Sequence, residues 1–132
     1  MSKLTKIMLL VAAFSVFVLT SVAMAATTYY YDTTLPTFGH KTVVEGRKEN
    51  TISYATNSMG NCESAYYGWI DYEHNNSWIN CTEDYTCYAN TTVLMYYSDA
   101  VPNTDSNVRL RTKAFSFLGG QRIVGRITFW VV

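Results

Sequence analysis

The chain has 132 residues, of which 48% are hydrophobic and 15% aromatic, and its ten basic and ten acidic side chains give no net charge. This composition excludes a disordered tail, and seven glycines without a three-residue period exclude a collagen-like chain. The length suffices for one small domain, but not for a second domain or a nucleotide-binding α/β fold. No G-x-S-x-G, H-E-x-x-H or phosphate-binding loop is present, so we expect neither an enzyme nor a cofactor.

The first 25 residues predict a secretory signal. Two lysines and no acid precede an unbroken apolar run over residues 7–19, and small residues occupy the −3 and −1 positions of a cleavage site after Ala25. An uncleaved membrane anchor is the alternative, because no charge lies between Lys6 and Asp32. With cleavage, residues 26–132 form one secreted, extracellular domain that keeps no transmembrane segment.

The rest of the chain is typical of short strands. Its apolar runs are β-branched and aromatic, polar turns separate them, and no window shows an apolar stripe of helical period. The expected strands cover residues 27–32, 41–45, 51–55, 64–72, 77–81, 87–97, 107–117 and 121–131. Eight short strands cannot bury their apolar side chains in one sheet. We therefore predict an all-β fold, a small antiparallel β-sandwich, with a small barrel as the alternative.

The last two expected strands suggest a hairpin, because Gly119-Gly120 suits a two-residue turn that needs positive φ. In that register Lys113 lies directly opposite Arg126. One face of the hairpin is apolar, and the other carries basic residues and aromatic rings. A slip of one residue would bury the charges, so the pattern specifies the register strongly.

The charges are segregated along the chain. Residues 50–107 contain seven acids and no base, whereas residues 108–132 contain five bases and no acid. One interpretation is that a neighbouring acidic strand neutralises the bases. The other is a docking face for an anionic partner: a phosphate-rich cell-wall polymer, an acidic glycan or a lipid surface, but not nucleic acid. The residues expected to form this face are Arg109, Arg111, Lys113, Arg122, Arg126 and Trp130, the first five neutralising anions and Trp130 acting as an anchor.

The three cysteines predict a disulfide, because thiols pair in an oxidising compartment. We prefer a Cys81–Cys87 bridge across a polar loop. The alternative is Cys62–Cys87, which a hairpin turning at His74-Asn75 would bring into register. A leftover Cys62 would either cross-link two copies or stay buried, and the cysteine and histidine spacing predicts no metal site.

Eleven tyrosines form the other excess in the composition. Doublets such as Tyr66-Tyr67 and Tyr96-Tyr97 send one ring to each face of a strand, so at least three rings should be exposed. Together with Trp69 and Trp78, exposed rings could stack on sugars. Ordinary cross-strand aromatic pairing is the alternative explanation.

Two short motifs carry a family resemblance: Ser-Asn-Val-Arg-Leu-Arg at 106–111 and Val-Gly-Arg-Ile-Thr-Phe-Trp at 124–130. With the signal layout, they make the chain similar to an uncharacterised family of small secreted all-β proteins of Gram-positive bacteria, and more distantly to lactococcin-type bacteriocins. The resemblance covers the signal and roughly the last 25 residues, while the cysteines and the acidic middle depart from it. It implies a bacterial source and a sandwich fold, and carries over no catalytic residue.

These observations together predict a small secreted binding protein without enzymatic activity, cofactor or metal. Two other classes remain open. One is a bacteriocin or toxin-like antimicrobial protein. The other is a structural surface protein that self-associates through tyrosine-rich edges or as a homodimer through Cys62.

Overall fold

The computed structural model describes residues 27–48, 53–98, 106–115 and 120–129, and within them it contains nine strands and no helix. The expected signal peptide, the turn residue Gly119 and the expected anchor Trp130 lie outside the described residues. The strands are β1 (Thr28–Thr34), β2 (His40–Lys48), β3 (Tyr54–Met59), β4 (Tyr66–His74), β5 (Ser77–Asn80), β6 (Tyr85–Cys87), β7 (Thr92–Tyr96), β8 (Ser106–Ala114) and β9 (Arg122–Thr128).

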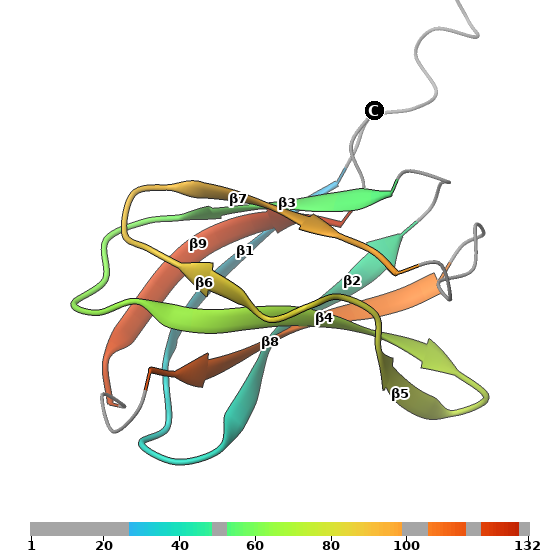
Figure 1. The fold of residues 1–132 in the computed structure, drawn as a ribbon, viewed down its shortest axis with the longest axis horizontal. Coiled ribbons are helices and arrows are strands. Elements are labelled where there is room, and N and C mark those ends of the chain that lie inside the picture. Colours follow the sequence, from blue (N-terminus) through green and yellow to red (C-terminus); the bar gives the residue numbers. More distant parts are fainter. Residues whose placement is uncertain (1–26, 49–52, 99–105, 116–119, 130–132) are drawn as a thin grey trace, which may run out of the picture.

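The strands form two antiparallel sheets packed face to face, which confirms the predicted sandwich (Figure 1). The first sheet has the order β1-β9-β3-β7, and the second has the order β2-β8-β4-β5 with β6 also paired to β4. The chain thus pairs from its ends inward, β1 with β9, β2 with β8 and β3 with β7, and most consecutive strands lie in different sheets. This nested order is the jelly-roll arrangement of a β-sandwich.

One expected strand, residues 87–97, is in fact two strands. Its first residue ends β6 in the second sheet, and its last half is β7 in the first sheet. The chain changes sheets at a tight turn, where Asn90 has a φ of 56° and the Thr91 hydroxyl donates to the Tyr88 carbonyl at 2.8 Å. Because β-branched and aromatic residues continue on both sides of this turn, the sequence pattern did not reveal the break.

The core lies between the sheets and is lined by alternate residues of strands such as β3, β8 and β9. β8 buries Val108 and Leu110 from one side, and β9 buries Ile123 and Ile127 from the other. These inward faces are the ones that the alternation predicts.

The predicted hairpin of the last two strands is wrong. β8 lies between β2 and β4, and β9 lies between β1 and β3, so the two strands belong to opposite sheets. Lys113 pairs with His40 and Tyr67, not with Arg126. The physical reason is that alternation fixes which face of a strand is buried but not which strand lies beside it. Two strands with one apolar face each bury those faces equally well from opposite sides of a sandwich.

A polar group bridges the two sheets inside the core. The Tyr31 hydroxyl donates to Asn57 Oδ1 at 2.9 Å, and the hydroxyls of Tyr31 and Tyr66 are 3.1 Å apart. Burial raises the pKa of Tyr31 to about 12 and raises that of Tyr66 as well. The ring of Tyr31 passes over Gly125, where a Cβ would collide with its hydroxyl, so glycine is needed at this position.

Candidate functional site

The structure divides the five predicted anion-binding cations between the two outer faces of the sandwich. Arg109, Arg111 and Lys113 alternate with the buried residues of β8 and point outward from the second sheet. Arg122 and Arg126 alternate likewise on β9 and point outward from the first sheet. The single basic face expected from the hairpin is therefore not formed, because that face required both strands to lie in one sheet.

Two of these cations are neutralised by carboxylates. Arg109 Nε lies 3.0 Å from Asp71 Oδ2 on β4, which confirms for this residue that an acidic neighbouring strand supplies the counter-charge. Arg122 forms a two-point pair with Asp32, at 2.8 Å from Nε and 2.6 Å from Nη2. The hydrogen bonds from Arg122 lower the pKa of Asp32. Neither guanidinium is therefore an uncompensated charge for a ligand.

Arg111 and Lys113 lie in a different environment, which we call the cationic half of the second sheet. It consists of two rows of outward-facing residues that pair directly across β2, β8 and β4. Its members are His40, Lys113 and Tyr67 in one row, Thr42, Arg111 and Trp69 in the next, and Phe115 beside them. Within the described strands, no carboxylate faces Arg111 or Lys113 in this register.

The rings of the cationic half are held by contacts with one another. Tyr67 and Phe115 stack with centroids 4.7 Å apart, and His40 meets the edge of Trp69 at 5.7 Å. Arg111 Nη1 donates to Thr42 Oγ1 at 3.0 Å, which leaves other guanidinium donors available. The arrangement presents positive charge beside ordered aromatic surface.

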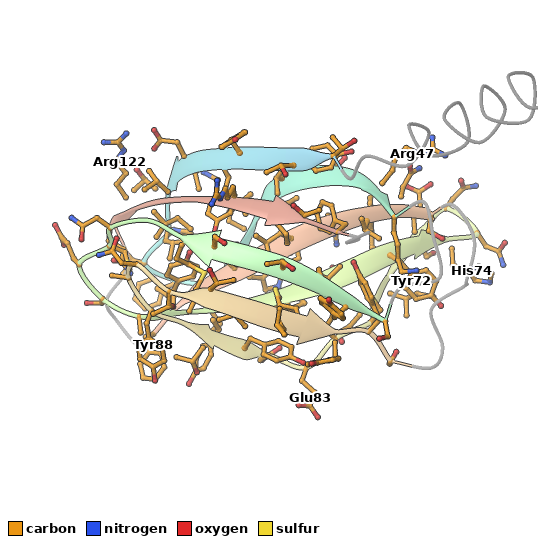
Figure 2. All side chains as sticks on the ribbon, turned by 90° about the horizontal axis from the view of Figure 1, so that it is seen from above. Arg47, Tyr72, His74, Glu83, Tyr88 and Arg122 are labelled. Carbon is orange, nitrogen blue, oxygen red and sulfur yellow. The ribbon has the colours of Figure 1, made fainter. Side chains whose placement is uncertain are left out.

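The other end of the same face, which we call the pocket half, is built around Arg109. Glu45 on β2 and Asp71 on β4 lie opposite this residue, and its guanidinium lies 4.4 Å from the ring centre of Trp78. An open pocket of about 290 Å³ lies beside Trp78. It is lined by Glu45, Gly46, Arg47, Glu73, Trp78 and Asn107. Figure 2 shows Arg47 at this end of the molecule and Arg122 at the opposite end.

The sequence patterns did not group the pocket residues, because they come from four strands. One part of the pocket could have been predicted from the sequence, because the Asn75-Asn76 pair favours a two-residue turn. Asn75 and Asn76 both have positive φ, as a two-residue turn between β4 and β5 requires, and this turn places Trp78 opposite Glu73. The pocket residues of β2 and β8 come beside this turn through the order of strands in the sheet, which no local sequence pattern predicts.

The outer face of the first sheet is rich in hydroxyls. The hydroxyl oxygens of Thr28 and Thr128 are 3.0 Å apart, as are those of Ser58 and Thr92. Tyr30 and Tyr96 on this face and Tyr88 in the turn after β6 are 75%, 53% and 58% exposed, which confirms that at least three tyrosine rings face solvent. Cross-strand pairing also occurs, since Tyr54 and Tyr96 lie 5.7 Å apart.

Neither predicted disulfide is formed, and all three thiols are free. Cys81 and Cys87 both lie along β4, the first bonded to Ile70 and the second paired with Tyr66. These positions are four residues apart, or about 13 Å, which is too far for a disulfide. Burial raises the pKa of both thiols to about 12, so they are inert at neutral pH.

The alternative Cys62–Cys87 bridge is absent too, since both thiols are free, and the strand register from which it was predicted is wrong. The hairpin turns at Asn75–Asn76 rather than at His74-Asn75, and the partner of Cys87 across β4 is Tyr66. Cys62 is half-buried, and burial raises the pKa of its thiol. A cross-link between two copies through Cys62 stays a prediction.

Comparison with known proteins adds no assignment: no family model, no curated protein and no solved structure matches the chain. The resemblance to small secreted proteins of Gram-positive bacteria therefore stays a prediction. Among the described residues, no three His, Cys, Asp or Glu side chains gather where they could hold a metal ion. The same part of the chain has no helix of a length and apolarity that would cross a membrane.

Proposed function

We propose that this is a secreted, non-enzymatic binding protein that docks on an anionic polymer through the cationic half. One observation carries the proposal: Arg111 and Lys113 lie in adjacent rows among aromatic rings, and no carboxylate among the described strands faces them. Of the predicted cations, Arg109 and Arg122 are already paired with acids.

The geometry favours a polymer over a small anion. Two successive outward residues of a strand are about 7 Å apart, so Arg111 and Lys113 present two charges in line along β8. They lie on an open face, not in a closed pocket, and a chain with repeated negative groups can contact both. The flat rings of Tyr67 and Phe115 beside Lys113 add surface for apolar contact.

Binding of the purified protein to dextran sulfate, with neutral dextran as reference, tests this proposal across a salt titration. Replacing Arg111 and Lys113 together with Gln should weaken binding about tenfold, because two exposed ionic contacts contribute ~0.5–1 kcal/mol each. Binding by the unmodified protein should also weaken between 0.05 and 0.5 M salt, since screening shortens the range of exposed charges.

The matched control replaces Arg122 and Arg126 with Gln. This variant loses the same charge from the opposite face of the sandwich and should bind within twofold of the unmodified protein. If both double variants weaken binding equally, the effect comes from the net charge of the protein, and the proposal that one face binds the polymer is wrong. Absence of binding at low salt would remove the proposal.

A further inference from the structure

We propose that the pocket half holds an uncharged saccharide ring, so that the anionic polymer is an acidic glycan. The inference rests on the proposed function and adds to it the class of ligand. It starts from the pocket of about 290 Å³ beside Trp78, which is near the lower end of the size range of ligand sites.

The polar side chains around the pocket are all planar groups with two hydrogen-bonding atoms or more. Glu45 and Glu73 supply acceptors, Arg47 supplies donors, and Asn107 supplies both. Neighbouring hydroxyls on a sugar ring need this mixture, because each hydroxyl both donates and accepts. The indole of Trp78 supplies an apolar wall for the C–H groups of the ring.

The balance of charge in the pocket half favours an uncharged ligand. Three carboxylates, those of Glu45, Asp71 and Glu73, lie with two guanidiniums, those of Arg47 and Arg109. An anion would meet the carboxylates of Glu45 and Glu73 at the pocket wall, and a cation would compete with two guanidiniums already present. A polar group without charge meets neither repulsion.

The wall of the pocket is ordered before any ligand binds. Asp71 holds Arg109 at 3.0 Å, and Arg109 in turn lies over the ring of Trp78 at 4.4 Å. Both members of the ion pair are largely buried, with side chains 18% and 10% exposed. An indole fixed in this way loses little side-chain freedom on binding, which favours affinity.

The pocket and the cationic half lie along one strand. Asn107 lines the pocket, and Arg111 and Lys113 follow it on the same side of β8. Six residues of a strand span about 20 Å, so an extended polymer laid along β8 reaches both. The structure therefore fits a chain in which an uncharged ring and negatively charged units occur within about 20 Å.

The test compares polymers that share charge but differ in sugar content. Polyphosphate is the anion without sugar; hyaluronan, alginate and polygalacturonate are acidic glycans; and a hexamer of N-acetylglucosamine is the neutral glycan. Glu73→Gln and Asn107→Ala change exposed side chains at the pocket and leave the Asp71–Arg109–Trp78 contacts intact. Each should weaken the preferred acidic glycan about fivefold to tenfold and leave polyphosphate within twofold.

The outcomes separate this inference from the proposed function. If no glycan binds more tightly than polyphosphate and neither pocket variant changes any affinity, the saccharide site is wrong while the anionic face stands. If a glycan binds through the pocket but the Arg111 and Lys113 double variant binds it equally well, the anionic face is wrong and the saccharide site stands. A protein that binds none of these polymers overturns both.

Discussion

Thr112 carries a fully buried hydroxyl on the inner face of β8. Its Oγ1 has no hydrogen-bond partner within the described part of the chain, and a buried polar atom without a partner destabilises the fold by about 1–3 kcal/mol. Thr112→Val keeps the shape of the side chain and removes the hydroxyl. We expect this change to raise the free energy of unfolding by about 1 kcal/mol, measured by urea denaturation at neutral pH.

Thr112→Ala is the control for shape. It removes the hydroxyl and a methyl group together, and the loss of packing should offset or exceed the gain. A Thr112→Val variant that is less stable than the unmodified protein would mean that the hydroxyl has a partner in solution, such as a buried water, and would contradict the prediction.

The pairing of β1 with β9 distinguishes the nested strand order from a C-terminal hairpin. The hydroxyls of Thr28 and Thr128 are in contact at 3.0 Å across these strands. We expect Thr28→Cys with Thr128→Cys to form a disulfide under air oxidation. The loop it closes has about 100 residues, so the bridge could stabilise the fold by up to about 4–5 kcal/mol. Peptide mapping by mass spectrometry identifies the bridge, and melting with and without reductant gives its effect.

The corresponding control is Lys113→Cys with Arg126→Cys, the pair that a C-terminal hairpin would place in contact. Its members lie on the outer faces of opposite sheets and should stay reduced. Bridging of this pair in place of the first would contradict the sheet order.

The same elements show what the sequence could predict and what it could not. Alternation along residues 108–114 and 123–129 predicted the buried faces correctly, because burial of a strand face is a local property of the pattern. The partners of those strands depend on connections that cross the core, and nothing in a two-residue period encodes them. The pattern therefore identified Arg111 and Lys113 as outward-facing cations, but it did not identify His40, Tyr67 and Trp69 as their neighbours. The pocket beside Trp78 was missed for the same reason.

The two outer faces of the sandwich differ in chemistry. The face of the first sheet carries paired hydroxyls and exposed tyrosines. Of the two cations on β9, Arg122 is neutralised by Asp32, which leaves the charge of Arg126. The face of the second sheet carries both the cationic half and the pocket half. An anionic ligand that needs two neighbouring cations should therefore bind to the face of the second sheet, where Arg111 and Lys113 lie in adjacent rows.

The core itself should make the protein sensitive to alkali. Burial raises the pKa of Tyr31, Cys81 and Cys87 to about 12, from ordinary values of 10.0 for the phenol and 9.0 for the thiols, and it also raises the pKa values of Tyr66 and Tyr97 above 10.0. Above pH 9 the unfolded chain releases protons that the folded chain keeps. Stability should therefore be complete below pH 9 and fall as the pH rises from 9 to 12.

Urea denaturation at pH 7, 9, 10 and 11 measures this loss, and tyrosinate absorbance reports ionisation in the same samples. Each unit by which folding raises a pKa contributes up to about 1.4 kcal/mol, and a small domain has only about 5–15 kcal/mol in total. Unfolding should thus occur below pH 12 and coincide with ionisation of the buried tyrosines. Replacing the exposed Tyr88 with Phe should leave the pH dependence unchanged, whereas Tyr31→Phe should reduce it. Ionisation of every tyrosine near pH 10 in a protein that stays folded would show that the phenols between the sheets are accessible to solvent, and the buried polar bridge would then be wrong.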